Sequence, residues 1–457
     1  MTMSAAYEIA KNARRAGNTL KTLSNESRSA ILYKIHDSLK AHKDAIKAAN
    51  EKDLEAAATN GLSSALTKRL NLFQGDKFDT MLQGITDVAD LEDPVGKVRL
   101  ARELDEGLTL YQVTAPVGVL LVIFESRPEV IANITALCIK SGNAGILKGG
   151  KESVNTFREM AAVINETIAV NEKATGVPVS AVQLIETRQD VSDLLDQDEM
   201  IDLVVPRGSN ALVRNIKNNT KIPVLGHADG ICSVYVDEFA DLVKAKRITV
   251  DAKTNYPAGC NAMETLLLNP RFAHWADVLT NMIASGVTLH TTPEVKKEYL
   301  AAMESSNSLT DDIRTHVVDA NEAEDFDKEF LSFDCAVKFV TSTQAAILHI
   351  NEHSSRHTDS IITEDKANAE QFLKGIDSAG VYWNASTRFA DGFRYGFGTE
   401  VGISTSKIHA RGPVGLDGLV TYQYQIRGNG NIAADYLGAG GNKAFVHKDL
   451  DISKVVL

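Results

Sequence analysis

The chain has 457 residues, of which 44% are apolar and 24% charged, as in an ordinary globular protein. Sixty acidic residues against 48 basic ones give a net charge of -12, and there is no dense Lys/Arg stripe, which disfavours a nucleic-acid partner. The longest apolar run, residues 119–124, is far shorter than the roughly 20 residues that span a bilayer. We therefore expect no membrane segment.

The first hundred residues predict a helical layer. Residues 1–17 have apolar side chains at helical spacing and lack the apolar core of a secretory signal, so we expect an ordinary first helix. A mitochondrial presequence is the alternative interpretation. Ser24 or Asn25 can cap the next helix, whose apolar face runs through residues 31–39. We assign no chemistry to this region.

From about residue 117 the pattern changes to alternating strands and helices. The predicted strands cover residues 117–124, 144–147, 181–185 and 201–205, and the predicted helices cover 130–139 and 153–170. Repeated strand-helix-strand units favour a parallel, doubly wound sheet. Such sheets bind ligands beyond the carboxyl ends of their strands, and we expect the same here.

A second α/β region begins near residue 233. Its predicted elements are a strand at 233–236, a helix at 242–253, and strands at 265–268 and 336–340. Two further stretches, 108–113 and 419–426, alternate as strands do although they are far apart in the sequence. We expect these two to pair into a projecting ribbon.

The cysteines are four in number and none forms a CxxC pair: Cys138, Cys232, Cys260 and Cys335. We predict neither a disulfide framework nor a zinc site, and a reducing compartment. Cys260 follows a Pro and a Gly, which indicates an irregular backbone, and the amide of Asn261 could bind an oxyanion. A thiolate near backbone N–H groups is a competent nucleophile, although a buried structural cysteine is the commoner case and is our interpretation of the other three.

Two turns are suited to an anionic ligand. In the segment 141–153 a strand leads into a glycine pair flanked by Lys148 and Lys151, and a helix begins at Ser153. A second glycine-bearing turn, with Gly208 and Ser209, follows another strand at the same edge of the predicted sheet. Neither is a Walker loop or a GxGxxG motif, so an ordinary strand-to-helix turn is the alternative.

A set of basic and hydroxyl side chains could bind a carboxylate or a phosphate. Its members are Arg127, Ser386, Thr387, Arg388 and Arg394. Solvated surface arginines are the alternative interpretation.

Six stretches are recognisable when taken together. They are APVGVLLVIFESRP (115–128), SGNAGILKGGKES (141–153), LVVPRGSN (203–210), PVLGHADGIC (223–232), NYPAGCNAMETLL (255–267) and ASTRFADGFRYGFGTEVGISTSKIHARGPVGL (385–416). On these motifs, which span most of the chain, the sequence resembles the aldehyde dehydrogenase superfamily and, within it, the γ-glutamyl phosphate reductase family.

The resemblance implies an α/β, aldehyde dehydrogenase-like fold in three parts. A doubly wound cofactor-binding domain would comprise residues 1–103, 117–230 and 380–401, and an α/β catalytic domain residues 231–379. A small β oligomerisation element would comprise residues 104–116 and 402–430. We expect a cytoplasmic homo-oligomer, a dimer or a tetramer.

The resemblance also implies a reaction and a cofactor. L-glutamyl 5-phosphate would be reduced by NADPH to L-glutamate 5-semialdehyde and phosphate, through a thioester on Cys260, as a step of proline biosynthesis. We expect the chain to hold the reductase without a fused kinase and to function alongside a separate glutamate 5-kinase.

The implied site residues fall into three groups, and no metal ligand is expected. The catalytic residues would be Cys260 and Asn261. The cofactor would be bound by Lys148, Lys151, Ser153, Gly208, Ser209 and Glu329. The substrate would be bound by Glu125, Arg127, Asn255 and Arg388.

Three departures from the superfamily pattern accompany these matches. The Glu with which oxidative members activate water aligns with Gly226 or His227, so a thioester would be protected from hydrolysis. The oxyanion-binding Asn is replaced by Glu125, which leaves the backbone N–H of Cys260 as the expected donor. Glu329 matches the ribose-binding Glu in position, but the FGP that normally follows is absent. An oxidative aldehyde dehydrogenase that releases free acid and a catalytically silent scaffold are the rival functions.

Overall fold

The computed structural model describes residues 5–62, 64–124, 127–208, 210–227, 229–436 and 440–455. The chain divides into two compact units. The first comprises Met1–Leu225, Phe397–Gly402 and Val414–Leu457, and the second comprises Gly226–Gly396 and Ile403–Pro413.

The helical layer predicted for the first hundred residues is confirmed. Its helices are α1 (Ala5–Leu20), α2 (Asn25–Ala41), α3 (Lys43–Thr59), α4 (Ser64–Leu70) and α5 (Lys77–Asp90). The small residues Ala6, Ala10 and Ala13 of α1 are buried, and this helix contacts β3, β4 and β5 of the first sheet. Ser24 caps α2 by accepting the backbone N–H of Ser27 at 3.2 Å, as expected of an N-cap serine.

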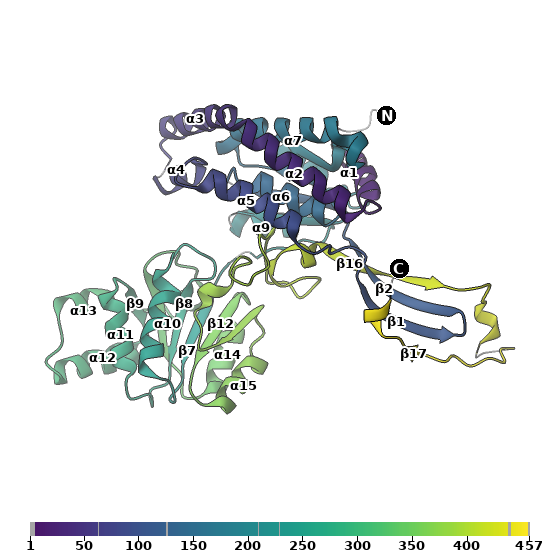
Figure 1. Ribbon diagram of the computed structural model, residues 1–457. Helices are drawn as coiled ribbons and strands as arrows, with labels where there is room; N and C mark the ends of the chain where they lie inside the picture. Colours follow the sequence, from purple (N-terminus) through teal and green to yellow (C-terminus); the bar gives the residue numbers. More distant parts are fainter. Residues whose placement is uncertain are drawn as a thin grey trace. The chain divides into compact units, whose positions relative to one another are not determined.

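The first unit, whose helices α2, α3 and α5 are labelled in Figure 1, contains a parallel sheet of four strands in the order β5-β4-β3-β6. The strands are β3 (Val119–Phe124), β4 (Ala144–Lys148), β5 (Val182–Ile185) and β6 (Leu203–Arg207), and the helices that follow them are α6 (Val130–Lys140), α7 (Val154–Thr175), α8 (Arg188–Leu195) and α9 (Asn210–Asn218). All six residues of β3 are buried, as in a strand covered on both faces. The order reverses between β3 and β6, where such sheets bind ligands.

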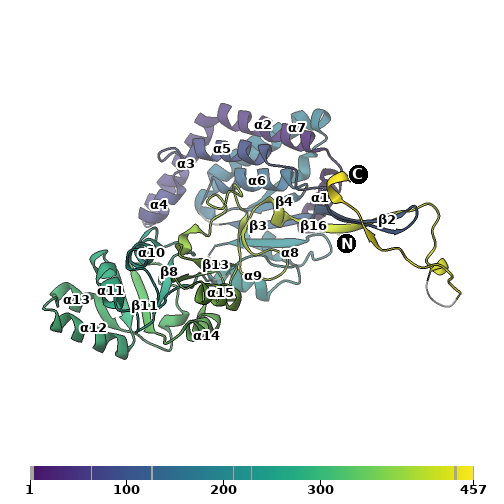
Figure 2. The same ribbon diagram turned by 60° about the horizontal axis from the view of Figure 1, so that its bottom comes forward.

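The ribbon predicted from residues 108–113 and 419–426 is confirmed and contains four strands. β2 (Leu108–Pro116) pairs antiparallel with β16 (Val420–Arg427), with Val113 opposite Gln423. β1 (Val98–Asp105) lies on the other side of β2, and β17 (Lys448–Asp449) pairs with β1. Figure 2 shows β2 and β16 side by side along this ribbon, which belongs to the first unit.

The second unit contains a parallel sheet of seven strands in the order β10-β9-β11-β8-β7-β12-β13. Its strands are β7 (Cys232–Val236), β8 (Met263–Leu268), β9 (Thr288–Thr291), β10 (Val317–Asp319), β11 (Asp334–Phe339), β12 (Thr358–Ile362) and β13 (Gly380–Trp383). Side chains alternate between two cores: Leu266 and Leu268 join one, and Leu267 joins the other. The first core holds helices α10 (Leu242–Thr254), α11 (Trp275–Ala284), α12 (Pro293–Ser305) and α13 (Asp311–His316), and the second holds α14 (Thr343–His353) and α15 (Lys366–Gly375).

The units differ from the expected domain boundaries at several places. Residues 226–230 and 403–413, expected in the cofactor-binding domain and the oligomerisation element, lie in the second unit. Residues 380–396 lie in the second unit rather than with the first sheet, because β13 pairs in parallel with β12. The ribbon begins at Val98 rather than at residue 104, because β1 pairs with β2 over its length. The functions expected of the three domains stay predictions.

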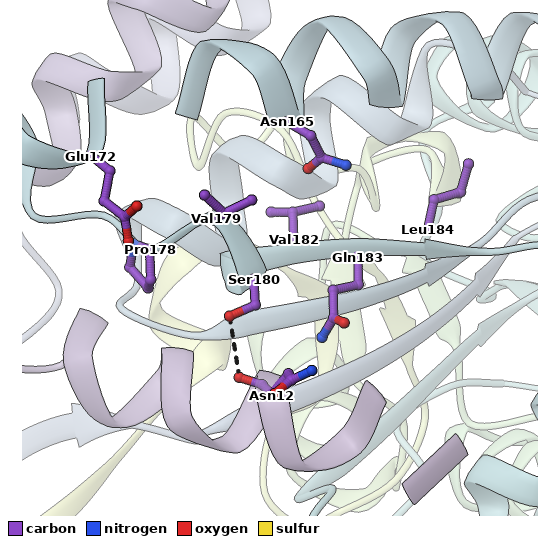
Figure 3. A pocket seen from close by; sticks show the side chains of 9 residues that line it. All are labelled: Asn12, Asn165, Glu172, Pro178, Val179, Ser180, Val182, Gln183 and Leu184. Carbon is purple, nitrogen blue, oxygen red and sulfur yellow. Dashed lines mark hydrogen bonds between the residues drawn. The ribbon is translucent and has the colours of Figure 1, made fainter. Parts of the chain in front are cut away.

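A groove with a volume of about 530 Å³ lies beside α1, α7 and β5 in the first unit (Figure 3). Asn12, Asn165 and Gln183 are among the side chains that line it, and the Ser180 hydroxyl donates to the Asn12 carbonyl oxygen at 3.4 Å. None of the predicted site residues lines this groove. Among the helices described, none is long and apolar enough to cross a membrane.

Candidate active site

Cys260 lies in a short loop between α10 and β8. The loop is held by its own backbone: the N–H of Gly259 donates to the carbonyl oxygen of Tyr256, and the N–H of Ala262 donates to that of Gly259. Tyr256 has a φ of 64°, in the left-handed region that residues with a side chain rarely adopt, so the backbone of this loop is irregular. Cys260 is partly exposed, whereas the other three cysteines are buried. Burial raises the pKa of Cys138 and of Cys335 to about 12, so both stay protonated at neutral pH.

Two histidines stand beside the Cys260 thiol. One ligand atom each of His227, Cys260 and His357 lie within 4.8 Å of one another. Nδ1 of His227 contacts the Ile403 carbonyl oxygen at 3.2 Å, and since a carbonyl only accepts, this nitrogen carries the proton and Nε2 has a lone pair. The two imidazole rings meet edge to face, with centroids 5.2 Å apart.

His357 is almost completely enclosed. Its exposed fraction is 1%, and burial, with smaller contributions from His227 and Arg388, lowers its pKa to about 3, so the ring is neutral. Nδ1 contacts the Thr358 hydroxyl at 2.9 Å, and Nε2 is buried without a hydrogen-bond partner. A neutral imidazole with an uncommitted nitrogen can exchange a proton or hold a metal ion.

These groups come from the loops that precede neighbouring strands. Gly230 precedes β7, Cys260 precedes β8, Glu329 precedes β11 and His357 precedes β12, and the four strands are adjacent in the order β12-β7-β8-β11 (Figures 1 and 2). Cys260, the predicted nucleophile, therefore lies at the amino ends of the second sheet. The expectation of a ligand beyond the carboxyl ends concerns the first sheet and does not extend to Cys260, because the irregular Cys260 turn leads into its strand instead of following one.

A buried ion pair closes the base of the Cys260 loop. Lys253, at the end of α10, lies 2.6 Å from Glu264 in β8, and both side chains are fully buried. Burial raises the pKa of the Glu264 carboxyl, and the Lys253 ammonium opposes this shift. Because the two residues bracket the loop, their contact holds its ends together.

Glu329 is linked to the Cys260 loop indirectly, through a residue that contacts the loop. Its carboxylate accepts the backbone N–H of Gly230 at 3.1 Å, and Gly230 contacts the backbone of Cys260. Burial raises the pKa of Glu329. The other carboxylate, Glu264, accepts the backbone N–H of Leu331 at 3.4 Å, which ties the segment that carries Glu329 to the ion pair.

Asn261 and Arg388 are brought together beside the cysteine. The Asn261 amide nitrogen donates to the carbonyl oxygens of Ala390 at 2.9 Å and Arg388 at 3.5 Å, and its oxyanion-binding role stays a prediction. The guanidinium of Arg388 lies 5.8 Å from the ring centroid of Tyr256, and a methyl group at Gly259 would come within 2.5 Å of it. Arg388 therefore lies against the loop that carries the nucleophile.

The other predicted substrate residues are less well placed. The Asn255 side chain is exposed and donates to the Asp251 carboxylate at 3.0 Å, which makes it the C-terminal cap of α10. Arg127 is exposed and follows β3 in the first unit. Glu125 lies outside the described residues.

The predicted cofactor residues of the first unit gather at the end of β4. Lys148 ends the strand and donates to the Gly149 carbonyl oxygen at 2.7 Å, and Lys151 is exposed at the next turn. Ser153 is completely buried, and its hydroxyl has no hydrogen-bond partner. A methyl group at Gly149 would come within 2.1 Å of the Phe157 ring, so only glycine fits between the lysines.

The start of α7 is already occupied by a carboxylate of the protein. Asp53, which is 2% exposed, accepts the backbone N–H groups of Asn155 at 3.1 Å and Thr156 at 2.8 Å, as well as the Thr156 hydroxyl at 2.6 Å. A cofactor phosphate cannot use these N–H groups, so the lysines and the Ser153 hydroxyl remain. This contact could not be predicted from the local sequence, because Asp53 lies on α3, about a hundred residues before α7.

The second predicted turn follows β6. Gly208 lies directly after Arg207, the last residue of that strand, and α9 begins at Asn210. Ser209 lies outside the described residues. β6 pairs with β3 in the first sheet, so this turn is at the carboxyl edge that the sequence predicts.

Comparisons with known proteins agree with this architecture. The model of the aldehyde dehydrogenase family matches residues 1–285. The chain is 74% identical over 456 residues to γ-glutamyl phosphate reductase of Saccharomyces cerevisiae, with 100% of each covered. It is 51% identical over 454 residues to the probable γ-glutamyl phosphate reductase of Schizosaccharomyces pombe, with 98% of each covered.

Solved structures give the same result. A γ-glutamyl phosphate reductase from Thermotoga maritima matches with a TM-score of 0.86 at 35% identity, covering 94% of this chain and 100% of that one. An acetylating aldehyde dehydrogenase from Geobacillus thermoglucosidasius, at 16% identity and a TM-score of 0.62 over 93% of this chain and 97% of that one, shares the fold. The chain belongs to the γ-glutamyl phosphate reductase family, within the aldehyde dehydrogenase family.

Proposed function

We propose that this enzyme reduces L-glutamyl 5-phosphate to L-glutamate 5-semialdehyde with release of phosphate, as a step of proline biosynthesis. The observation that carries the mechanism is the partly exposed Cys260 thiol, placed within 4.8 Å of two imidazole nitrogens. The Glu with which oxidative relatives would activate water aligns with Gly226 or His227, neither of which has a carboxylate. A thioester on Cys260 would therefore lack that carboxylate base for its hydrolysis.

The chain's own residues account for the proton and acyl transfers. His227 accepts the thiol proton at Nε2, and the Cys260 sulfur attacks the γ-carbonyl carbon, so that a C–S bond forms and the C–O bond to phosphate breaks. The backbone N–H of Cys260 donates to the oxygen that becomes negative. NADPH, when bound, supplies the hydride that reduces the thioester carbon. The C–S bond of the resulting thiohemiacetal then breaks, which releases the aldehyde and returns the proton to sulfur.

The first unit fits a nicotinamide dinucleotide. The buried Ser153 hydroxyl has no hydrogen-bond partner among the residues that the structure describes, and Lys148 and Lys151 lie at the same strand-to-helix turn. Together they would hold the adenosine end with its 2′-phosphate, which favours NADPH over NADH. Gly208 and Ser209 would meet the diphosphate, and Glu329 the nicotinamide ribose.

The same proposal extends to the surroundings of the enzyme. The ribbon offers its edge strand β16, on which Tyr422, Tyr424 and Ile426 are exposed, to a second copy of the chain in a dimer or a tetramer. We place the enzyme in the cytoplasm, where a separate glutamate 5-kinase supplies the acyl phosphate.

The test uses the reverse reaction. Glutamate 5-semialdehyde and NADP⁺ should give NADPH only when phosphate or arsenate is present, because the thioester needs an added nucleophile. Rapid NADPH formation in phosphate-free buffer, with glutamate as the product, would establish the oxidative function instead. A chain that binds the substrates but turns over in neither direction would establish the scaffold.

A further inference from the structure

The Cys260 thiol and the two imidazoles form a set of ligands that zinc prefers. Zn²⁺ binds thiolate sulfur and imidazole nitrogen, and three protein ligands with one open position are typical of exchangeable or catalytic sites. The three residues come from three different loops of the second unit, at positions 227, 260 and 357, and their ligand atoms lie within 4.8 Å of one another.

His357 provides an observation that is independent of this clustering. Its side chain is 1% exposed, and its Nε2 is a buried polar atom without a hydrogen-bond partner among the described residues. An unpaired buried polar group is unfavourable, so such groups normally have a function or bind a further partner. A metal ion between the three ligands would satisfy this nitrogen.

The hydrogen bonds of the two rings suit metal binding. Nδ1 of His227 donates to the Ile403 carbonyl oxygen, and Nδ1 of His357 contacts the Thr358 hydroxyl, so each ring is held through Nδ1 and would bind a metal ion through Nε2. Metal-binding histidines in proteins usually have their second nitrogen fixed by a carbonyl or another acceptor in this way.

The three ligand atoms need to move only a short distance toward one another to bind a zinc ion. Ligand atoms around a tetrahedral zinc ion lie roughly 3.3–3.6 Å apart, given Zn–N and Zn–S bonds of about 2.0 and 2.3 Å. From separations of at most 4.8 Å the ligand atoms must therefore approach by about 1.5 Å at most, and Cys260 and His227, which are both partly exposed, can rotate to do so.

We propose that His227, Cys260 and His357 bind one Zn²⁺ ion reversibly, and that the bound ion switches the enzyme off by occupying its nucleophile. Three ligand-to-zinc bonds form, the thiol proton passes to solvent, and no atom is oxidised or reduced. Neither the site nor its test depends on which substrate the enzyme uses. No sequence motif indicates this site, since the ligands are 33 and 97 residues apart.

Cobalt is the probe for the test, because Co²⁺ takes zinc's place and absorbs light. The purified full-length enzyme, reduced and free of metal, is titrated with CoCl₂. One equivalent should produce the strong visible bands of tetrahedral cobalt and a near-ultraviolet thiolate-to-cobalt band. Zn²⁺ should displace these bands and reduce activity at least about ten-fold, and EDTA should restore it.

Variants of the three ligands distinguish a three-ligand metal site from binding of the ion by the Cys260 thiol alone. Cys260→Ala should abolish the thiolate band, and His357→Gln and His227→Gln should each weaken cobalt binding by about ten-fold or more, since even changes outside the ligand set cost 10- to 100-fold. The control is His274→Gln, on the surface of the same unit, which should bind as the wild type does. His227 is partly exposed and provides the test if the buried His357 variant fails to fold.

Two results would overturn the proposal. One is cobalt binding that is equally tight in both histidine variants, which would mean that the thiol alone captures the ion. The other is a weak, octahedral cobalt spectrum without a thiolate band. A protein that gives the tetrahedral spectrum but fails the phosphate-dependence test would keep this site and lose the proposed reaction.

Discussion

Gly230 and Cys260 are in direct backbone contact, although 30 residues separate them. A methyl group built on Gly230 would lie 2.0 Å from the carbonyl oxygen of Cys260 and 2.5 Å from its Cα. Atoms this close must move apart, and here the obstacle is main chain rather than a flexible side chain. Because the Gly230 N–H also binds Glu329, this one contact positions the nucleophile relative to a predicted cofactor residue.

Gly230→Ala should therefore displace the nucleophile. We expect a loss of about 1–3 kcal/mol in the free energy of unfolding from overpacking. We also expect a fall of about 100-fold in kcat/KM, the effect of a shift of roughly 1 Å in a reacting group. Urea denaturation and steady-state kinetics are the measurements. Gly415→Ala, whose new methyl would meet its nearest atom at 3.5 Å, is the control and should change neither quantity much.

Cys260→Ser should abolish turnover while the protein stays folded and binds NADPH. A serine hydroxyl has a far higher pKa than a thiol, so even beside His227 it yields much less of the anion that attacks and is a far weaker nucleophile here. Activity above a few per cent of wild type would remove Cys260 from the mechanism. Cys138→Ala is the comparison: its thiol is completely buried, so its removal should lower the melting temperature more than the rate.

Lys151→Glu should change the choice of cofactor. The new carboxylate repels a 2′-phosphate that the ammonium attracts, and Asp53 already neutralises the start of α7. An exposed charge pair is worth about 1 kcal/mol. Counting lost attraction and new repulsion, the NADPH-over-NADH preference in kcat/KM should fall roughly 10- to 100-fold.

The control for this change is Lys173→Glu, the same charge reversal in the last turn of α7. It should leave the cofactor ratio unaltered. An unchanged ratio in Lys151→Glu itself would place the 2′-phosphate elsewhere, with Arg207 as the next candidate.

The Lys253–Glu264 pair should show strong coupling. Removing one partner leaves an unpaired buried charge, so Lys253→Met and Glu264→Leu should each lower the free energy of unfolding by about 3–5 kcal/mol. The double variant should lose less than either single one, since it leaves no unpaired charge. Chemical denaturation of all four proteins gives the coupling free energy. Strictly additive losses would show that the pair does not act as a unit.

His349 should make the second unit less stable in acid. It is 8% exposed, lies against Phe326 and His353, and burial lowers its pKa from 6.5 to about 3. Between these values the unfolded chain binds a proton that the folded chain does not, so stability is complete above pH 6.5 and falls as the pH falls toward 3. At pH 5 the loss from this residue is about 2 kcal/mol.

The measurement is urea denaturation at pH 7.5 and pH 5 for the wild type and His349→Gln. Glutamine does not titrate, so the variant should lose less stability between the two pH values, whatever its stability at pH 7.5. An identical pH dependence in the two proteins would assign the acid sensitivity to other groups.

The sequence by itself determined the secondary-structure elements and singled out Cys260 as the proposed nucleophile. Continuous apolar runs such as residues 119–124 become strands buried on both faces, because periodicity is a local property of the chain. The β2–β16 ribbon followed from two alternating stretches, and the Cys260 segment followed from a motif that lies within thirteen residues. Local pattern is sufficient where the physical cause is local.

Only the tertiary structure decided what surrounds the nucleophile. Adjacent parallel strands bring the loops with His227, Cys260 and His357 together, and no spacing in the sequence records that neighbourhood. Asp53 reaches the start of α7 from a different helix, and β13 joins the second sheet rather than the first because its backbone pairs with β12. Burial, pairing partners and unsatisfied nitrogens depend on contacts between distant residues, and such contacts exist only once the chain has folded.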